Sequence, residues 1–255
     1  MTYSVFLDFD GTILPESADR QGIKISDRLL KALNEAKAAG HKIFLNTGRP
    51  LSTLPVDALR GFKFDGYLCG SCYINVGGRV LMSDRMTADQ LQPVVAHFYG
   101  TDTVVLLEGE FVTYAAYAKE SEHFLPVSDM REIFKICELE PITKMTILKY
   151  LQGDDLEFVR EFGDPILRDD AGFTELVPKG HDKAYVVKKT VEYLDLDPET
   201  VIAVGDSRND IAVLDCVKYP VAMGNASDEV KSHAKYVVPS VEEDGVCEVL
   251  EKLPK

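Results

Sequence analysis

The chain has 255 residues, and its 42 acidic residues outnumber its 28 basic ones, which gives a formal net charge of -14. This excess argues against a protein that coats nucleic acid or binds an anionic membrane, because both need clustered Lys and Arg. The 45% hydrophobic and 27% charged residues are typical of a globular chain. The sequence shows neither an apolar run long enough to span a bilayer nor a secretory leader, so we expect a soluble cytoplasmic protein.

The N-terminal part alternates short apolar runs with a helical pattern. Residues 3–7 are rich in strand formers and end abruptly at Asp8. Ser26 is a candidate N-cap for a helix whose apolar residues recur at helical spacing up to Gly40. Residues 41–45 form the next strand-like run, which also ends in polar residues. This order predicts a strand, a helix and a second strand.

The middle of the chain has a different pattern. Residues 103–107 and 111–114 flank a short polar turn and predict a hairpin, and residues 166–168 and 173–177 predict a closing pair of strands. Hairpins mixed with helices are typical of an α+β unit. We therefore predict that residues 81–178 form such a unit, inserted into the domain around it.

The C-terminal part returns to the alternating pattern. Lys183 opens a helix, and residues 201–204 form a strand that ends at Gly205 and Asp206. Continuous apolar strands that alternate with helices predict an α/β fold, with a doubly wound, mostly parallel sheet buried on both faces. Residues 1–80 and 179–255 are expected to build this core together.

Polar side chains follow the predicted parallel strands where each strand ends. The segment Asp8-Phe9-Asp10-Gly11-Thr12 follows the first strand, Thr47-Gly48-Arg49 ends the second, and Gly205-Asp206-Ser207-Arg208-Asn209-Asp210 follows a third. The carboxyl ends of parallel strands share one sheet edge, where open α/β sheets bind ligands. An Asp-Gly turn with solvated acids is the simpler interpretation of the first segment alone. Acids, a hydroxyl and a cation at three strand ends favour a functional site instead.

These segments, together with Lys183 at a helix start, resemble the four motifs of the haloacid dehalogenase (HAD) superfamily of phosphotransferases. The inserted unit resembles the large α/β cap of the Cof-type branch, which residues 178–183 and 222–226 also match. The resemblance covers nearly the whole chain. It implies a HAD-like, Rossmann-type core that carries out phosphoryl chemistry and an α+β cap that selects the substrate.

The paired acids of the first motif suit phosphoryl transfer. A carboxylate can attack a phosphoryl group in line and form an aspartyl-phosphate, and a second carboxyl can act as acid and then as base. The resemblance assigns the nucleophile to Asp8 and the acid/base role to Asp10. It also implies Mg²⁺ held by Asp8, the backbone carbonyl of Asp10 and Asp206, with Asp210 as support. A cation offsets the repulsion between nucleophile and ester, about 4 kcal/mol per charge pair at about 4 Å and an effective dielectric of about 20.

Hydrogen-bond donors should surround the transferring phosphoryl group. Lys183 and Thr47 are the first candidates, and Lys183 is preferred over Lys179, which lies in an expected loop. Arg49 is either a substrate contact or a structural partner for an acid at the sheet edge. The predicted substrate-binding set is completed by Thr12, Gly48 and Asn209.

The predicted function is a Mg²⁺-dependent phosphatase of small phosphomonoesters. Sugar phosphates are the first substrate class, and a phosphorylated cofactor or its precursor is the nearest alternative. A phosphomutase would use Asp10 and Mg²⁺ equally well. A phosphoryl-accepting signalling domain also uses an Asp nucleophile, but it needs neither a cap nor a second carboxyl that speeds hydrolysis. We expect a small phosphorylated substrate as the partner and a monomer or small homo-oligomer.

Two further features remain open in the sequence. Cys69-Gly70-Ser71-Cys72 has the spacing of a redox pair or half a metal site, but the sequence contains no second such pair and no clear helix start at Cys69. The five cysteines are odd in number and scattered, so we predict no disulfide framework. Lys144, on an expected cap strand, either lines the cap or lies on a solvated face.

Overall fold

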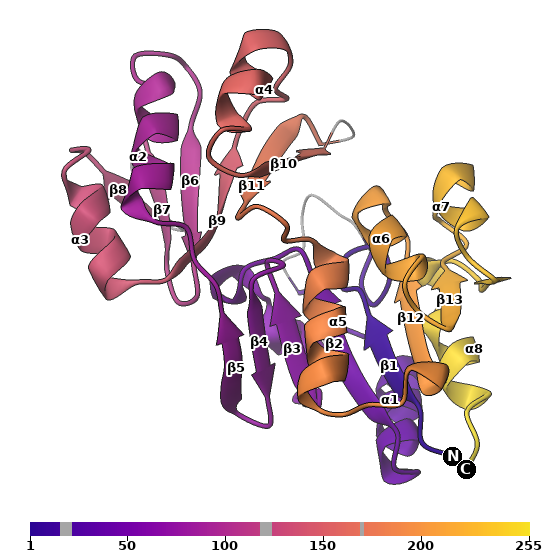
Figure 1. The fold of residues 1–255 in the computed structure, drawn as a ribbon. Coiled ribbons are helices and arrows are strands. Elements are labelled where there is room, and N and C mark those ends of the chain that lie inside the picture. The colour runs from indigo at the N-terminus through magenta and orange to yellow at the C-terminus, as the bar shows by residue number, and fades with distance from the viewer. Residues whose placement is uncertain (16–21, 118–123, 169–170) are drawn as a thin grey trace.

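Two sheets with their own helices make up the described residues, 1–15, 22–117, 124–168 and 171–255, of the computed structural model (Figure 1). The larger sheet has eight strands in the order β14-β13-β12-β1-β2-β3-β4-β5. Its strands are β1 (Ser4–Leu7), β2 (Lys42–Thr47), β3 (Gly66–Cys69), β4 (Tyr73–Val76), β5 (Arg79–Ser83), β12 (Val201–Gly205), β13 (Tyr219–Ala222) and β14 (Tyr236–Val237). The strands from β14 to β3 pair in parallel, so the predicted α/β fold with a mostly parallel sheet is confirmed.

Helices cover both faces of this sheet, which is why its central strands are apolar throughout (Figure 1). Val5 and Leu7 of β1 belong to the apolar cluster that contains α1 (Asp27–Ala38) and α8 (Val246–Glu251). Phe6, between them, packs in the cluster on the opposite face, where its ring stacks on Phe44 at 4.7 Å. The helices of that second face are α5 (Lys183–Tyr193), α6 (Ile211–Leu214) and α7 (Asp228–Ser232).

The smaller sheet belongs to the cap and has six strands in the order β10-β11-β9-β6-β7-β8. Its strands are β6 (Val105–Gly109), β7 (Thr113–Ala116), β8 (Leu125–Val127), β9 (Ile142–Ile147), β10 (Asp164–Arg168) and β11 (Phe173–Val177), and its helices are α2 (Ala88–His97), α3 (Glu132–Leu139) and α4 (Gly153–Val159). The three helices pack on the sheet through one apolar cluster that includes Leu91, Ile133 and Val159. The predicted hairpin and closing strand pair are both present.

The core sheet also contains an antiparallel part that the sequence did not predict. After β3 the chain forms β4 and β5, which pair in antiparallel fashion and extend the sheet beyond its parallel strands. The turn at Gly77 and Gly78, both with positive φ, joins them. The chain enters the cap from the end of this hairpin, so the hairpin fixes where the cap begins.

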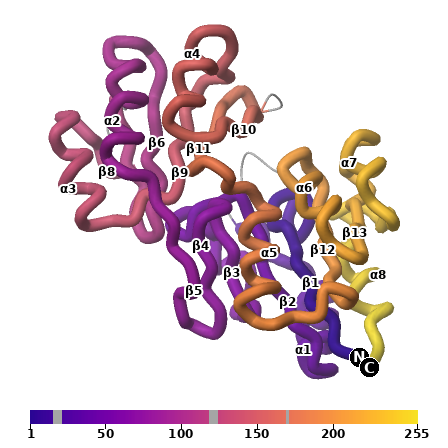
Figure 2. Tube along the Cα trace, in the orientation of Figure 1, coloured from indigo at the N-terminus to yellow at the C-terminus, as the bar shows by residue number. Residues whose placement is uncertain are grey.

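The chain crosses between core and cap twice, and the two crossings lie side by side (Figure 2). Asp84 lies on the outgoing crossing, after β5, and His181 lies on the returning one, before α5. His181 Nε2 lies 2.9 Å from Oδ2 of Asp84, and the Tyr185 hydroxyl donates to the same oxygen at 3.3 Å. These contacts tie the two crossings together at the base of the cap.

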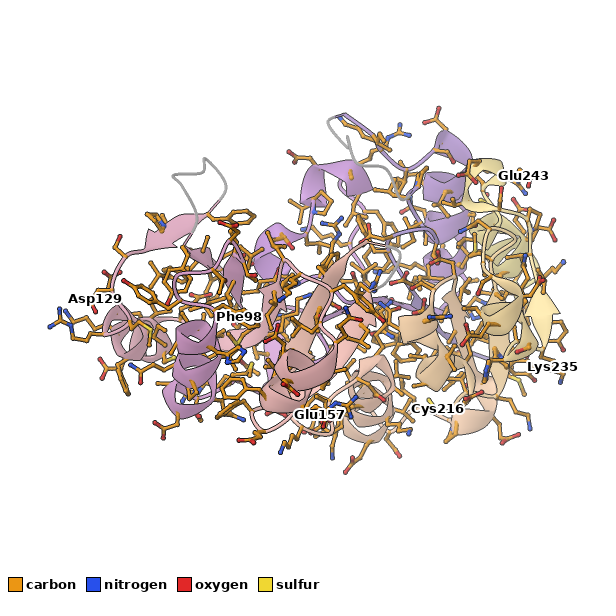
Figure 3. The ribbon with its side chains drawn as sticks, turned by 90° about the horizontal axis from the view of Figure 1, so that it is seen from above. Phe98, Asp129, Glu157, Cys216, Lys235 and Glu243 are labelled. Carbon is orange, nitrogen blue, oxygen red and sulfur yellow. The ribbon has the colours of Figure 1, made fainter. Side chains whose placement is uncertain are left out.

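Seen from above, the molecule is elongated, with Asp129 at the outer end of the cap and Lys235 and Glu243 at the far end of the core (Figure 3). The N- and C-termini lie close together at the end of the core away from the cap (Figure 1). Among the described residues, none of the helices has the length and apolarity needed to cross a bilayer.

Candidate active site

A cavity of about 270 Å³ lies at the carboxyl edge of the parallel strands, between the core and the cap. Most of the residues predicted from the sequence line it, and each comes from the end of a strand or the start of a helix. The lining residues from the core include Asp8, Asp10, Thr47, Gly48, Arg49, Lys183 and Asn209. Segments far apart in the sequence therefore converge on one crevice.

Lys183 lies between two buried carboxylates at the base of this cavity. Its Nζ donates to Oδ1 of Asp8 at 2.6 Å and to Oδ1 of Asp210 at 2.8 Å. Burial alone would lower the pKa of the ammonium, but the charges of Asp210 and Asp8 raise that pKa above its ordinary value. Burial, followed by the charge of Asp210, raises the pKa of the Asp8 carboxyl. The three groups form a core triad that keeps Lys183 charged.

The second oxygen of Asp8 is in a different situation from the first. In the part of the chain that the structure describes, Oδ2 of Asp8 accepts no hydrogen bond, whereas Oδ1 accepts one from Lys183. Asp8 also lines the cavity. One oxygen is therefore held in place while the other is open to an incoming electrophile, which is the arrangement that a carboxylate nucleophile needs.

Asp206 lies against the turn that follows β1. Its Oδ1 accepts from the Thr12 hydroxyl at 3.2 Å, and its Oδ2 accepts from Nδ2 of Asn225 at 3.3 Å. Asn225 also donates to the backbone carbonyl of Gly11 at 2.9 Å. A Cβ on Gly11 would lie 2.0 Å from Oδ2 of Asp206, and the φ of Gly11 is +77°, so only glycine lets the turn approach the carboxylate. The Thr12 hydroxyl thus contacts Asp206, and Thr12 is not among the cavity-lining residues.

Asp210 is fixed by its own loop. Its Oδ2 accepts from the backbone N–H groups of Asp206 and Ser207 at 3.2 and 3.1 Å, while its Oδ1 accepts from Lys183. A Cβ on Gly205 would lie 2.4 Å from the carboxylate carbon of Asp210, so glycine is required there as well. Both oxygens of Asp210 are engaged, which holds the loop that carries Asp206.

The buried acids suit a hard divalent cation. Asp8, Asp206 and Asp210 each offer an oxygen within 4.8 Å of the others. All three are buried, and Lys183 contributes one positive charge against their three negative charges. Oxygen-only donors match the preference of Mg²⁺, and a buried excess of negative charge favours its binding. The residues present therefore fit a Mg²⁺ ion.

Arg49 forms a two-pronged ion pair with Asp10. Its Nε donates to Oδ2 of Asp10 at 2.7 Å, and its Nη2 donates to Oδ1 at 3.2 Å. The guanidinium carbon lies 5.9 Å from the centre of the Phe9 ring. The structure thus shows Arg49 as the partner of an acid, which is one of the two roles considered for it. Arg49 and Asp10 also both line the cavity.

The remaining predicted residues lie around this centre. The Thr47 hydroxyl accepts from the backbone N–H of Arg49 at 3.1 Å, and the Asn209 amide lies 3.6 Å from where a Cβ on Gly48 would be. Lys179, the alternative to Lys183, is exposed and is not among the residues that line the cavity. Asn225 is the contact that reasoning from the sequence missed, although it lies in a segment that matched the Cof-type branch.

The cap side of the cavity is also charged and polar. Lys144 is buried there rather than on a solvated face. The other cap residues that line the cavity are Glu108, Thr146, Arg168, Phe173 and Glu175, and none of them was predicted as a site residue.

The cysteine pair plays no visible part in this site. Cys69 and Cys72 are buried thiols, and neither forms a disulfide with another cysteine in the described ranges. Burial raises the pKa of Cys69 to about 12 and raises that of Cys72 as well. Thiols with raised pKa values form little thiolate, which disfavours redox chemistry here.

This chain is similar to known proteins over nearly its whole length. A family model described as haloacid dehalogenase-like hydrolase matches residues 5–250. The chain is 28% identical over 256 residues to the 5-amino-6-(5-phospho-D-ribitylamino)uracil phosphatase YcsE of Bacillus subtilis. This alignment covers 96% of this chain and 93% of that protein.

Solved structures share the fold over nearly the whole chain. The HAD subclass IIB sugar phosphatase BT4131 matches with a TM-score of 0.79 and 22% identity, over 98% of both chains. A haloacid dehalogenase-like hydrolase from B. subtilis matches with a TM-score of 0.82 and 20% identity, over 99% of this chain and 100% of that one. Both therefore have a core and an inserted cap that correspond to those described here.

Proposed function

The chain belongs to the haloacid dehalogenase-like hydrolases, as a phosphatase of the Cof-type branch, and we propose that it hydrolyses small phosphomonoesters through a phosphorylated Asp8, with Mg²⁺ as cofactor. Sugar phosphates are the proposed substrate class. The observation that carries the proposal is the Asp8 carboxylate, with Oδ1 held by Lys183 and Oδ2 accepting no hydrogen bond from any described residue.

The reaction proceeds in two steps on this carboxylate. Asp8 attacks phosphorus, a bond forms between its oxygen and phosphorus, and the bond from phosphorus to the ester oxygen breaks. Asp10 gives its proton to the departing oxygen and then takes a proton from the water that attacks the phosphorylated Asp8, which releases phosphate. Arg49 fixes the Asp10 carboxyl at the cavity wall through two hydrogen bonds.

The chain's own charges prepare this site for an anionic ester. Lys183 is held charged beside Asp8, and Thr47, Gly48 and Asn209 line the same cavity, where they surround the phosphoryl group. Mg²⁺ bound by Asp8, Asp206 and the backbone carbonyl of Asp10 would offset the repulsion between carboxylate and ester. Asp210 supports these ligands because it fixes the loop that carries Asp206.

The chain leaves β5 at Ser83, a little after the predicted boundary at residue 81, and the proposed role of the cap that follows is to select the leaving group and exclude water. The names of two similar proteins support the substrate class. One is a sugar phosphatase, and the other acts on a phosphorylated ribityl chain, so both names describe the phosphate ester of a polyhydroxylated carbon chain. A phosphorylated cofactor precursor of that kind remains the nearest alternative substrate.

The test is phosphate release from a panel of sugar phosphates, polyol phosphates and nucleotides, with Mg²⁺ and with chelator. We expect Mg²⁺-dependent turnover that is abolished by Asp8→Asn and retained by Asp57→Asn, an exposed aspartate of the core. Near-full turnover by Asp8→Asn would overturn the assignment of the nucleophile. Steady release of phosphate without an acceptor separates a phosphatase from a mutase.

A further inference from the structure

The cap contributes a buried charged cluster to the cavity, built across three of its strands. Glu108 lies on β6, opposite Lys144 on β9, and Glu175 on β11 lies opposite Thr146 on β9. The side chains of Glu108, Lys144 and Glu175, the cap triad, are 9%, 4% and 10% exposed. All three line the same cavity as Asp8, so the cap triad faces the site where the phosphate ester reacts.

Lys144 is held by partners in both the cap and the core. Its ammonium donates to Oε1 of Glu175 and to the backbone carbonyl of Gly48 at 2.9 Å, and it forms an ion pair with Oε2 of Glu108 at 3.2 Å. Two of its three N–H groups are therefore used in hydrogen bonds, and its positive charge lies between the two carboxylates. Lys144 therefore positions the two carboxylates and joins the cap to the loop that carries Gly48 in the core.

The two carboxylates retain open acceptor oxygens. Glu108 Oε2 accepts from the Thr146 hydroxyl at 3.0 Å and forms an ion pair with Lys144, and Glu175 Oε1 accepts from Lys144. In the part of the chain that the structure describes, the other oxygen of each carboxylate accepts no hydrogen bond. Both carboxylates line the cavity, so these oxygens are placed to accept from donors that a ligand brings.

We propose that Glu108 and Glu175 form the leaving-group subsite, and that they select a polyhydroxylated leaving group without a second anionic group. The inference rests on the proposed phosphatase function and specifies its substrate. Hydroxyls of the leaving group donate to the open oxygens. Because the triad carries two negative charges and one positive charge, a second phosphate or carboxylate there is repelled. Arg168 also lines the cavity, but it is only partly buried, and its guanidinium carbon lies 6.0 Å from the centre of the Phe173 ring.

The first experiment compares kcat/KM for three substrates of the wild-type enzyme with Mg²⁺. They are a hexose 6-phosphate, the corresponding 1,6-bisphosphate, and p-nitrophenyl phosphate, whose leaving group presents no hydroxyl chain. We expect kcat/KM for the hexose 6-phosphate to exceed that for each of the other two substrates by about tenfold or more. The bisphosphate is repelled by the like charge of the cap triad, and the aryl phosphate lacks the hydroxyl donors. A bisphosphate used equally well, or a hexose phosphate used no better than the aryl ester, would overturn the subsite. Failure to hydrolyse any phosphomonoester would instead overturn the proposed function.

The second experiment changes the carboxylates. In Glu175→Gln and in Glu108→Gln, we expect the ratio of kcat/KM for the hexose phosphate over the aryl phosphate to fall about tenfold. In the double variant, which leaves Lys144 uncompensated, discrimination against the bisphosphate should disappear. The matched control is Glu110→Gln, a buried cap carboxylate that accepts from the Ser83 hydroxyl and is not among the cavity-lining residues. An unchanged ratio in both single variants contradicts the proposal.

A third measurement keeps the proposal testable if the cap variants fail to fold. Calorimetric binding to the Asp8→Asn protein leaves the cap intact, and we expect the hexose 6-phosphate to bind at least about tenfold more tightly than its 1,6-bisphosphate. The reverse preference, abolished by Arg168→Gln, would mean that Arg168 makes the subsite cationic, and the proposal would be wrong.

Discussion

The core and the cap each bury a lysine between two carboxylates, but they build this arrangement on different backbones. In the core triad, Lys183 lies between Asp8 and Asp210, on loops and a helix start at the carboxyl edge of parallel strands. In the cap triad, Glu108, Lys144 and Glu175 lie on neighbouring strands of the cap sheet and meet through its register. One side of the cavity is thus made by loop geometry and the other by strand pairing.

The two triads differ in which of their carboxylate oxygens accept no hydrogen bond from the described residues. Asp210 has both oxygens filled, one by Lys183 and one by two backbone N–H groups, so only Asp8 offers an open oxygen in the core triad. Glu108 and Glu175 each keep one open oxygen. The core triad is therefore organised around one reacting atom, whereas the cap triad presents two acceptors that suit binding. Five predictions test this contrast, in order of decreasing expected effect.

The largest effect is expected from Lys183→Met. Removing the ammonium leaves Asp8 and Asp210 buried without their cation, which should cost about 3 to 5 kcal/mol of unfolding free energy. Turnover of every substrate should fall by about a thousandfold or more, because the phosphoryl group loses its cation as well. Urea denaturation in the presence of chelator and steady-state kinetics measure the two effects. Lys179→Met, on the exposed neighbour, is the matched control and should change neither quantity.

Lys144→Met directly tests the contrast between the core triad and the cap triad. It should cost a similar free energy of unfolding, since it also leaves two carboxylates buried, but its loss of kcat should be about tenfold or less, with a larger share in KM. If Lys144→Met abolished turnover of all substrates as completely as Lys183→Met, the division between reacting and binding triads would be wrong.

Removal of divalent cations comes next. Chelation should abolish turnover and destabilise the folded protein, because a ligand that binds only the native state at a hundred times its dissociation constant contributes about 2.7 kcal/mol. Thermal denaturation with and without Mg²⁺ measures the effect, which should be much reduced in Asp206→Asn. A melting temperature that does not respond to Mg²⁺ in the wild type would argue against a cation at the three core acids.

Gly11→Ala should have a smaller effect on stability and a clear one on catalysis. Its Cβ would meet Oδ2 of Asp206 at 2.0 Å, in a backbone conformation that already strains an L-residue, so we expect a cost of about 2 kcal/mol and a displaced Asp206. Gly40→Ala is the control, because Gly40 has a φ of +92° but nothing within 4 Å of its Cβ position. If both variants kept wild-type kcat, the close packing of Gly11 on Asp206 would have no role in positioning that acid.

The same contrast explains what the sequence could predict. The core motifs could be predicted because the end of an apolar strand marks the edge of a sheet. The acids that directly follow such a strand lie at that edge, so their position depends mainly on local sequence. Ser26 as an N-cap was confirmed on similar local grounds, since its side chain accepts from the backbone N–H of Leu29. The antiparallel β4–β5 hairpin, with its turn at Gly77 and Gly78, was not predicted, because its strands of 4 and 5 residues are too short to show a clear alternation of apolar and polar residues.

The cap triad could not be derived from spacing. Glu108 meets Lys144 only because of the pairing between β6 and β9, and that register shifts at Glu108 and Gly109. The shift occurs where the Glu140 carboxylate packs so closely that a Cβ on Gly109 would lie 2.3 Å from it. Asn225 likewise reaches the Gly11 carbonyl from 214 positions away in the sequence. Contacts of this kind depend on the folded backbone rather than on any local pattern.

The smallest effect concerns an ion pair on the surface of the cap, which extends the contrast from buried to exposed charge. Hydrogen bonds from Lys149 at 2.7 Å and between His97 and the carboxylate at 2.8 Å lower the pKa of Asp155 below its ordinary value of 3.8. A depressed pKa in the folded state means stability that is present above the ordinary value and lost as the pH falls through the folded value. The Lys149 side chain is 49% exposed, so solvent screens the pair and its contribution should be only about 0.5 kcal/mol.

We therefore expect Asp155→Asn to lower the urea midpoint slightly near pH 7, and we expect this difference to shrink as the pH falls below 3.8 and through the lowered pKa of the folded-state carboxyl. Asp154→Asn, at the neighbouring exposed position in the first turn of α4, is the control for the favourable effect of an acid at a helix N-terminus. A difference that stayed constant or widened on acidification would mean that Asp155 acts through packing rather than charge. If Asp155→Asn lowered the free energy of unfolding as much as Lys144→Met does, this would contradict the view that the cap triad contributes more to stability because it is buried.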